Sequence, residues 1–457
     1  MSKGHISTAR EAAFTVLLQT EREAAYANLA LKKYLDQARL GPEDARLAAR
    51  IVYGSVRHKL ALDHIISQLL TRPDARLMTE ARIILRLSLF QLHYLDRVEA
   101  YAVTDDGVEL ARRHCGEAIA RLVNAVLRSY LRREDRSALL PGREAGFAYL
   151  HHTLSYPKWL ADYLLRRFGP EEAERFCLAL NEPAPVYLRT NTLRLRREEL
   201  QAALAQCGVT AVPAGFTYET LRVEAGAGKL AAGNPFRSGG CIVQGPASQL
   251  AAHALHPASG SRVLDLCAAP GGKTTHLAAL MADQGELHAF DIHPHKIALI
   301  EANLKRLGLT CVTAAAADAA ALPASYQGWA DYILLDAPCT GLGVLNARPD
   351  SRYHKRPEDI AALAEQAYRL LEAAAAYLAP GGRLCYTTCT VTHEENEDNI
   401  RRFLAAHPEF SLQPMSELAA MMSRPEDAAA ANAGQLQLLP HVHGCEGFFL
   451  ALLRKER

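Results

Sequence analysis

The stretch from Asp265 to His276, which reads DLCAAPGGKTTH, restricts the possible folds of this chain more than any other part of the sequence. A short apolar run, 262–266, comes before it, and a helical pattern follows from Thr274 to about Met281. A strand, a glycine turn and a helix in this order are how a doubly wound α/β domain places a nucleotide-like ligand. Glycines in the turn let a ligand approach the backbone, and the first N–H groups of the helix favour an anionic group on that ligand.

Two simpler interpretations of this glycine turn compete with binding of such a ligand. A phosphate-binding loop of the type G-x-x-x-x-G-K-[ST] would also end in the letters found at 272–274, but it needs glycine at the position of Cys267, so we reject it. The turn taken alone is also compatible with an ordinary turn that binds nothing. The acidic residues that follow later strands argue against this second interpretation.

Apolar, strand-like runs alternate with helical patterns over the C-terminal half of the chain. Alternation of this kind predicts a mostly parallel sheet that is covered by helices on both faces. We therefore expect a Rossmann-like catalytic domain over residues 236–457. Its strands are predicted at 262–266, 286–290, 311–314, 332–335 and 383–387, with a closing strand at 447–453.

The first 140 residues contain one helical pattern after another and no strand signal. In the last pattern, Ile119 to Leu131, the apolar residues share one face, and Arg121 and Arg128 lie on or near the other. Each such arginine is more often part of a solvated face than of a binding site. We expect an all-α domain over residues 1–140, with helices at 10–19, 25–35, 42–56, 60–70, 77–95, 102–114 and 119–131.

Between the helical and the catalytic domain, the pattern changes to a small α+β module. It is expected over residues 150–235, after a linker at 136–155 that contains proline and glycine. One of its strand-like runs carries Tyr187, Arg189 and Asn191. Side chains of these types on a strand can stack on and pair with single-stranded RNA. Core and surface roles for the same three residues are an equally good interpretation.

Acidic residues follow three successive strands of the predicted sheet. Asp291 comes directly after the second strand, where an acid accepts hydrogen bonds from the two hydroxyls of a ribose. Asp318 follows the third strand at the level of an adenine edge, and Asp336 ends the fourth. Each could cap a helix instead, but three acids beside a glycine turn suit a ligand with a ribose, an adenine and a positive charge. S-adenosylmethionine has all three, whereas a dinucleotide would need the G-x-G-x-x-G pattern that this chain lacks.

Two cysteines follow strands at the carboxyl edge of the sheet, where open α/β folds keep their reactive sites. Cys339 stands in PCTGLG after the fourth strand, and Cys389 stands in YTTCT after the fifth. We do not expect a zinc site made of Cys385, Cys389 and His393. An extended strand would separate the Cα atoms of its two cysteines by about 13 Å, too far for one tetrahedral ion. Cys385 is expected in the core.

A thiol at this edge suits methylation of a carbon atom of cytosine. C5 of the aromatic ring is a poor nucleophile, but addition of a thiolate to C6 makes C5 enamine-like and able to attack a sulfonium methyl group. A base must then remove the C5 proton so that the thiol can leave. Asp336 is well placed to bind the N3/N4 edge of the ring.

The motifs resemble those of the RNA (cytosine-5) methyltransferase family, and the likeness covers nearly the whole chain. Five motifs carry it: DLCAAPGGKTT at 265–275, DAPCTGLG at 336–343, YTTCT at 386–390, EENE at 394–397 and GCEGFF at 444–449. In the N-terminal part, RLSLFQL at 86–92, YAV at 101–103 and LVNAVLR at 122–128 are similar to the RNA-binding helical domain of the antitermination factor NusB.

The resemblance implies a reaction and a set of site residues. In that family the cysteine matching Cys389 is the nucleophile, the one matching Cys339 helps to release the product, and Asp336 orients the base. The implied S-adenosylmethionine site consists of Cys267, Ala268, Ala269, Pro270, Gly271, Gly272, Lys273, Asp291, Asp318 and Asp336. The likeness is greatest to the ribosomal small-subunit branch of the family, which implies cytosine 967 of 16S ribosomal RNA, in the usual numbering, as the target.

The chain departs from the family pattern at several positions. Threonine stands at 340 and 390 where serine is common, and DSRY at 350–353 replaces the usual DIRW. Threonine keeps the hydroxyl and Tyr353 keeps a stacking ring, so neither change threatens the chemistry. Gly245 follows Gln244 where an acid is often found, which leaves the local contacts there open.

The composition indicates which class of protein the chain belongs to. Its 49% hydrophobic and 22% charged residues are typical of a soluble globular protein, and it contains neither an apolar run of 18 residues nor the core of a signal peptide. Ten cysteines without a disulfide-type spacing indicate reduced thiols. We expect a cytoplasmic monomer with 16S ribosomal RNA as partner, S-adenosylmethionine as cofactor, and neither a metal nor a membrane.

Two other functions remain beside this hypothesis. A transfer RNA substrate would leave the chemistry unchanged, and methylation assays on both RNAs would separate the two substrates. A non-catalytic RNA-binding assembly factor related to NusB would bind RNA without binding S-adenosylmethionine. The presence of both cysteine motifs argues against this last alternative.

Overall fold

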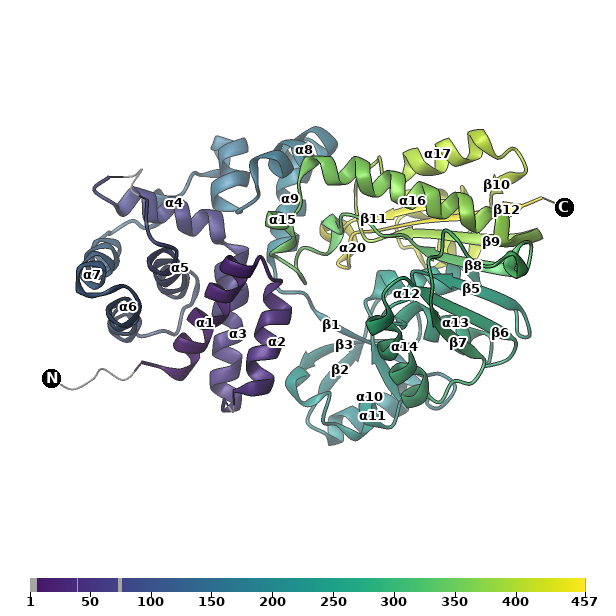
Figure 1. The fold of residues 1–457 in the computed structure, drawn as a ribbon, viewed down its shortest axis with the longest axis horizontal. Coiled ribbons are helices and arrows are strands. Elements are labelled where there is room, and N and C mark those ends of the chain that lie inside the picture. Colours follow the sequence, from purple (N-terminus) through teal and green to yellow (C-terminus); the bar gives the residue numbers. More distant parts are fainter. Residues whose placement is uncertain (1–5, 39, 73–75, 457) are drawn as a thin grey trace. The chain divides into compact units, whose positions relative to one another are not determined.

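The computed structural model describes residues 6–38, 40–72 and 76–456, and the chain divides into two compact units (Figure 1). The first unit comprises Met1–Glu182 together with Leu345–Arg356, and the second comprises Pro183–Val344 and Pro357–Arg457. A short segment from the second half of the sequence is thus part of the N-terminal unit. None of the described helices combines the length and apolar character that a membrane crossing requires.

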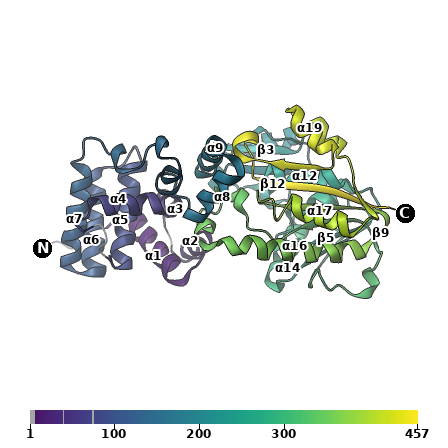
Figure 2. The same cartoon turned by 90° about the horizontal axis from the view of Figure 1, so that it is seen from above.

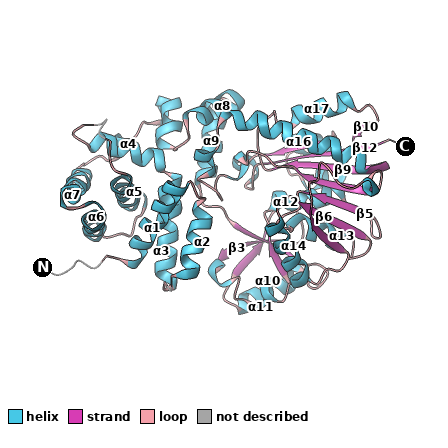
Figure 3. Ribbon diagram, viewed as in Figure 1, coloured by secondary structure: helices cyan, strands magenta, loops and turns pink. Residues whose placement is uncertain are grey.

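In its described residues, the first unit is built from helices without any strand, as the sequence predicts (Figure 3). Helix α5 packs against α1, α3, α4, α6 and α7, and its residues from Ile83 to Gln91 are all buried. The helices are α1 (Thr8–Glu23), α2 (Ala27–Gln37), α3 (Pro42–Arg57), α4 (Lys59–Leu69), α5 (Thr79–Tyr94), α6 (Ala100–Cys115), α7 (Glu117–Leu131), α8 (Lys158–Phe168), α9 (Pro170–Asn181) and the short α15 (Ser351–His354).

The predicted linker at 136–155 contains secondary structure of its own. It contains the short helices η1 (Ser137–Leu139), η2 (Arg143–Ala145) and η3 (Tyr149–Thr153). Leu139, Leu150 and Leu154 are buried, so apolar side chains pack this stretch onto the helical unit. Apolar residues spaced irregularly over short helices give no clear period, which is why the sequence pattern does not predict them.

The segment Leu345–Arg356 is held inside the helical unit by buried polar contacts. Asp350 accepts a hydrogen bond from the backbone N–H of Ala27 (2.6 Å), at the start of α2. Arg352 is fully buried, and its guanidinium lies over the ring of Tyr156 at 4.2 Å. Arg352 Nη1 also donates to Asn181 Oδ1 (2.9 Å), so the segment packs into the first unit through both of its polar side chains.

The second unit begins with a small antiparallel sheet of strand order β2-β3-β1-β4. Its elements are β1 (Val186–Thr190), α10 (Arg197–Gln206), β2 (Thr210–Pro213), β3 (Thr220–Ala225), η4 (Ala227–Lys229), α11 (Asn234–Arg237) and β4 (Cys241–Val243). The interpretation of Tyr187, Arg189 and Asn191, on or directly after β1, as RNA-facing residues is wrong, because all three are buried, as the alternative of a core role has it. Arg189 donates to the carbonyl oxygen of Gly272 (2.8 Å), so this strand ties the small sheet to the glycine turn.

The large sheet has the strand order β10-β12-β9-β8-β5-β6-β7, with β11 paired to β12. Strands β5 to β9 pair in parallel, and β12 closes the sheet antiparallel to β9 near the end of the chain (Figure 2). The strands are β5 (Arg262–Leu266), β6 (Glu286–Asp291), β7 (Val312–Ala316), β8 (Ala330–Asp336), β9 (Leu378–Thr388), β10 (Phe410–Leu412), β11 (Gln435–Leu438) and β12 (Phe448–Lys455). All six predicted strands are present, and the additional β10 and β11 are too short to give a sequence pattern.

Helices cover both faces of the large sheet. Val263 belongs to a core shared with α12, α13 and α14, whereas Leu264 belongs to a core shared with α16 and α17. Neighbouring residues of a strand point to opposite faces, so the two cores lie on the two sides of the sheet. The helices of this unit are α12 (Pro246–Leu255), α13 (Gly272–Leu280), α14 (Pro294–Leu307), η5 (Ala324–Tyr326), η6 (Leu342–Val344), α16 (Pro357–Tyr377), α17 (Glu397–Ala406), α18 (Ser416–Met421), α19 (Pro425–Asn432) and α20 (Pro440–His443).

Candidate active site

The glycine turn lies between β5 and α13 and borders a cavity. Gly271 has a φ of 94°, in the region that favours glycine, and the helix begins at the next residue. Cys267 also has a positive φ, of 66°. The cavity is lined by Val243, Gln244, Gly245, Ser248, Asp265, Cys267, Ala268, Ala269, Pro270, Gly272, Lys273 and Asp336. Most of the turn predicted to bind a cofactor therefore faces one cavity, together with Asp336.

Asp265, at the floor of this cavity, is a functional candidate that the sequence pattern does not single out. Its Oδ2 accepts a hydrogen bond from Thr274 Oγ1 (2.6 Å), but its Oδ1 has no hydrogen-bond partner among the residues that the structure describes. Burial raises the pKa of Asp265 to about 7. A buried carboxylate oxygen without a donor is costly, so the site suits a ligand that brings a positively charged donor. The only signal in the sequence is an acid inside the apolar run of β5.

Asp291 and Asp318 lie at the ends of the next two strands. Asp291 is buried at the end of β6, accepts a hydrogen bond from the backbone of His293 (3.0 Å) and lies 3.7 Å from the ammonium of Lys296. Asp318 follows β7, is exposed and accepts a hydrogen bond from the backbone of Ala320 (2.9 Å). Asp318 thus closes a local turn in this structure, and no described helix begins at it, so it is not the helix cap weighed as its alternative role.

Asp336 and Lys273 form an ion pair that joins the ends of β8 and the glycine turn. Lys273 Nζ donates to Asp336 Oδ2 (2.7 Å), and Thr387 Oγ1 donates to Asp336 Oδ1 (2.8 Å). Burial alone would lower the pKa of Lys273, but the charge and hydrogen bond of Asp336, together with the nearby Cys389, outweigh burial and raise it. Lys273 is therefore a fixed positive charge beside the cavity.

Cys339 and Cys389 meet in space, with their Sγ atoms 3.4 Å apart. Their loops follow β8 and β9, which are parallel neighbours with Asp336 opposite Thr387. The hydrogen bond with Cys389, together with burial and the charges of Cys389 and Glu395, raises the pKa of the Cys339 thiol well above its ordinary value. Burial and the neighbouring sulfur therefore disfavour ionisation of the Cys339 thiol.

A buried carboxylate, Glu395, joins the two cysteine loops. Its Oε1 accepts from the backbone N–H of Thr340 and its Oε2 from the Thr340 hydroxyl, both at 2.6 Å. The hydroxyls of Thr340 and Thr390 lie 2.7 Å apart. Because these threonines directly follow Cys339 and Cys389, Glu395 fixes the spacing of the thiols. Burial raises the pKa of Glu395 despite these hydrogen bonds.

Cys385 lies on β9 opposite Leu452 and is fully buried. This is the core position that the strand pattern predicts for it. Burial raises the pKa of its thiol to about 12, as expected for an inert structural cysteine. His393 forms an ion pair with Glu397 (3.4 Å).

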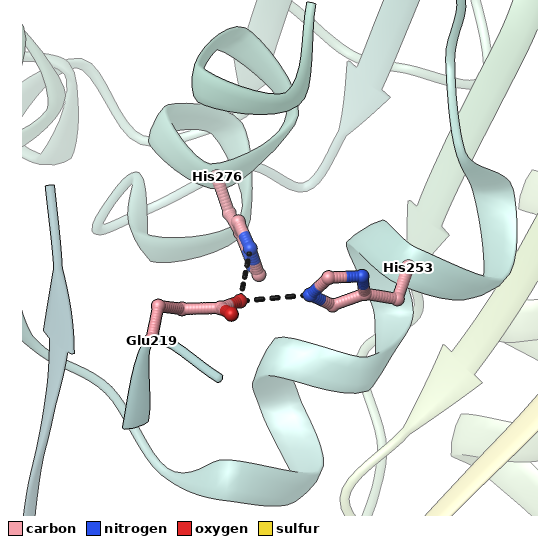
Figure 4. A group of neighbouring side chains, drawn as sticks. All are labelled: Glu219, His253 and His276. Carbon is pink, nitrogen blue, oxygen red and sulfur yellow. Dashed lines mark hydrogen bonds and ion pairs between the residues drawn. The ribbon is translucent and has the colours of Figure 1, made fainter. Parts of the chain in front are cut away.

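Figure 4 shows a group of residue types that often bind metals, Glu219, His253 and His276. The Nε2 atoms of His253 and His276 lie 2.7 and 3.0 Å from the same oxygen of Glu219. Ligand atoms of a tetrahedral zinc ion would lie about 3.3 Å apart, so these separations are those of hydrogen bonds. The buried guanidinium of Arg189 is close enough to help lower the pKa of His276 to about 3, after burial itself. The group thus ties β3, α12 and α13 together by hydrogen bonds. Three residues from distant parts of the sequence give no motif, so the pattern does not predict it.

Comparisons with known proteins agree across the chain. The family model for the 16S rRNA methyltransferase RsmB/F matches residues 252–454, the NusB family matches 7–132, and an RsmF/B-like ferredoxin-like domain matches 156–228. The ribosomal RNA small subunit methyltransferase B of Vibrio cholerae is 33% identical, with 99% of each chain covered. The protein of the same name from Klebsiella pneumoniae is 33% identical over 92% of each chain.

Solved structures give the same result. The crystal structure of PH0851 has a TM-score of 0.79 and 28% sequence identity, and covers 97% of this chain and 98% of its own. The structure of NSun6 from Pyrococcus horikoshii with SFG has a TM-score of 0.60 and 28% identity, and covers 68% of this chain and all of its own. With its NusB domain, its ferredoxin-like module and its Rossmann-like catalytic domain, the chain belongs to the family of ribosomal RNA small subunit methyltransferases of the RsmB/F type.

Proposed function

We propose that this protein transfers a methyl group from S-adenosylmethionine to C5 of a cytosine in 16S ribosomal RNA, through a transient bond between Cys389 and C6. The observation that carries the proposal is the pair of thiols 3.4 Å apart beside a charged cavity. By resemblance, the target is cytosine 967 in the usual numbering. A cytoplasmic location, where ribosomal RNA is made in bacteria, follows from this substrate.

The residues around the glycine turn fit S-adenosylmethionine, which when bound supplies an electrophilic methyl group. The unpartnered Oδ1 of Asp265 offers a hydrogen-bond acceptor and negative charge to its ammonium group. Asp291 offers a carboxylate to its ribose hydroxyls. The backbone from Cys267 to Lys273 borders the same cavity. A relative of this fold is known in a structure with SFG, which supports a cofactor of this class.

The two thiols have different roles in the proposed reaction. Two thiolates 3.4 Å apart would repel each other, so only one ionises readily. The family resemblance assigns the role of nucleophile to Cys389, and the ammonium of Lys273 lies nearby to stabilise its negative charge. Its sulfur forms a bond to C6 of the cytosine, and the electrons of the C5–C6 double bond become available at C5.

Return to an aromatic ring requires loss of the proton from C5 and cleavage of the bond between sulfur and C6. The electrons of the C5–H bond re-form the C5–C6 double bond while those of the S–C6 bond return to Cys389. Cys339 lies next to the sulfur that leaves, and we assign it to this release step. Asp336 has acceptor positions left beside Lys273 and Thr387, and it holds the N3/N4 edge of the base.

The helical domain has the surface expected for a role in holding RNA. Arg121, Arg128, Arg132 and Arg133 on and after α7 are exposed. Exposed guanidinium groups attract phosphates without sequence preference. In this proposal the NusB domain contributes affinity for the RNA, and the two thiols together with the cavity residues Lys273 and Asp336 contribute the chemistry.

The decisive test measures transfer of labelled methyl groups from S-adenosylmethionine to 16S ribosomal RNA and to transfer RNA in parallel, followed by mapping of the modified nucleotide. The wild-type protein should label 16S ribosomal RNA at C5 of one cytosine, and Cys389→Ser should label neither RNA. Labelling of transfer RNA alone would show that the substrate is transfer RNA and not 16S ribosomal RNA. RNA binding without any methyl transfer would favour the alternative that the protein is a non-catalytic assembly factor.

A further inference from the structure

Helix α12 begins beside the cofactor cavity without a side chain that can cap it. Gly245 is its N-cap residue and Pro246 its first residue, and no side-chain hydrogen bond comes from the N-cap position itself. Glycine offers no side-chain acceptor to the free N–H groups of a first turn. Gln244, Gly245 and Ser248 all line the cavity, so the order of this helix start determines the shape of one cavity wall.

The space that a side chain at position 245 would fill is occupied by the carboxylate of Glu446. A Cβ atom added to Gly245 would lie 1.2 Å from Glu446 Oε1. The backbone at Gly245 has a φ of −67° and a ψ of 151°, which any residue can adopt. A side chain at position 245 would therefore have to displace the Glu446 carboxylate, whereas the backbone conformation itself accepts any residue.

Glu446 makes the contact that the N-cap residue cannot make. Its Oε2 accepts a hydrogen bond from the backbone N–H of Ala247 (3.3 Å), which is the second residue of α12. A carboxylate at a helix N-terminus also interacts favourably with the helix dipole. Burial raises the pKa of Glu446, whereas this hydrogen bond and the charge of Lys273 oppose the rise.

The position of Glu446 in the chain connects this helix start to the active site. Glu446 directly precedes Gly447, whose N–H donates to the carbonyl oxygen of Gly343 (2.9 Å), and the N–H of Gly343 donates to the carbonyl oxygen of Cys389 (3.0 Å). Two residues further, Phe448 lies under the ammonium of Lys273 at 5.2 Å. One short stretch therefore contacts the first turn of α12, Gly343 in the Cys339 loop, and Lys273 of the ion pair at the cavity.

We infer that Glu446 acts as the N-cap of α12 from outside the helix, in place of a side chain at position 245, and so holds the wall of the cavity formed by Gln244, Gly245 and Ser248. Glu446 is a positioning residue in this scheme. The sequence has Gly245 where an acid is often found in the family. Here the carboxylate of Glu446, from another segment of the chain, reaches the same helix end. The effect on cofactor binding rests on the proposed function of the cavity.

A reciprocal exchange of the two positions tests the inference. Glu446→Ala removes the cap, and Gly245→Asp with Glu446→Ala returns a carboxylate to the same helix end from within the helix. Aspartate is among the best N-cap residues. Gly245→Asp alone would place two carboxylates in one space and should be less stable than the wild type. Glu301→Ala, an exposed acid on α14, serves as the matched control.

Two measurements follow each variant: calorimetric binding of S-adenosylmethionine, and hydrogen exchange of the peptide that contains the first turn of α12. Glu446→Ala should weaken binding about fivefold, the effect of losing about 1 kcal/mol of capping energy, and should speed exchange at Ala247 and Ser248. The double variant should restore both, and Glu301→Ala should change neither. If Glu446→Ala fails to fold, Glu446→Gln, which keeps an acceptor but loses the charge, should give a smaller loss.

The outcomes separate this inference from the proposed function. If the wild type binds S-adenosylmethionine and Glu446→Ala binds it equally with unchanged exchange, Glu446 is not a cap and the inference is wrong. A double variant that is folded but no better than Glu446→Ala overturns it as well. If the wild type does not bind S-adenosylmethionine, the proposed function fails, while hydrogen exchange still decides whether Glu446 caps α12.

Discussion

The thiols of Cys339 and Cys389 lie 3.4 Å apart although 50 residues separate them in the chain. The distance follows from the parallel pairing of β8 and β9, which end at the same edge of the sheet, and from the carboxylate of Glu395 between their loops. In the proposed reaction, two thiols at this distance share the first step and the last step of one covalent cycle. Their reactivity can be examined separately.

The first prediction concerns the covalent intermediate. Cys389→Ser should reduce methyl transfer to background, because a serine hydroxyl is far less ionised than a thiol at neutral pH. Cys339→Ala should leave a protein–RNA adduct, because attack remains possible while release is impaired. A denaturing gel of each variant incubated with RNA and S-adenosylmethionine checks both expectations. Absence of an adduct with Cys339→Ala would remove the assigned role of Cys339 in release.

The second prediction concerns oxidation. A small shift would bring the two sulfurs from 3.4 Å to disulfide bonding distance. A mild thiol oxidant, which takes up two electrons and two protons, should therefore form a Cys339–Cys389 disulfide and abolish methyl transfer, and dithiothreitol should restore it. Peptide mapping by mass spectrometry identifies the bond. Loss of activity without this cross-link, or a cross-link that leaves activity intact, would contradict the prediction.

The third prediction uses the raised pKa of Asp265, which is about 7 in the folded protein and about 3.9 for an unperturbed aspartate. Between these values the folded state binds one more proton than the unfolded state, so stability falls as pH rises. The ligand-free wild type should lose stability relative to Asp265→Asn from about pH 4 to pH 7 and then level off. Denaturant unfolding at several pH values measures the difference. A difference independent of pH would show that Asp265 titrates normally.

Cofactor binding should have the opposite dependence on pH. An ionised Asp265 is the better partner for an ammonium group, so S-adenosylmethionine should bind more tightly as pH rises through about 7. Asp265→Asn should bind more weakly at high pH and lose this dependence. Calorimetric titration across the same pH range provides the measurement.

The fourth prediction concerns Glu395. Glu395→Ala leaves the backbone N–H of Thr340 without its acceptor, and one unsatisfied buried donor costs about 1–3 kcal/mol. We expect a lower Tm, a lower kcat and a nearly unchanged KM for S-adenosylmethionine, because the cofactor cavity is formed elsewhere. Formation of the Cys339–Cys389 disulfide should also become slower. Glu394→Ala, at the neighbouring exposed position, is the control. Equal disulfide rates in both variants would mean that Glu395 does not set the spacing.

Local patterns predict the frame of this protein well. The strand, glycine turn and helix at 262–280 and the cysteines after β8 and β9 could be placed because each depends on a few consecutive residues. The turn also begins its helix two residues earlier than the period indicates, at Gly272. Short strands such as β10, with three residues, carry too few side chains to show a period.

Contacts between distant segments could not be predicted in the same way. Arg189 looks like an RNA-facing residue on a strand, yet it is buried against the glycine turn. The sequence does not distinguish Asp265 from other acids in motifs. Only the structure shows that one of its oxygens lies at the cavity without a hydrogen-bond partner among the described residues. Glu219, directly before β3, meets one histidine from α12 and one from α13, and Glu446 fills the space beside Gly245. Each depends on tertiary packing, which no single stretch of sequence encodes.

Leu345–Arg356 belongs to the helical unit although it is encoded between two parts of the catalytic domain. A single cut after Glu182 therefore yields two incomplete pieces: one lacks its last helix, and the other carries Arg352 without the aromatic ring that shelters it. The helical unit is formed from two separate stretches of the chain, so one recombination event at a single point could not add or remove it whole. Engineers who wish to exchange it must transplant both stretches together.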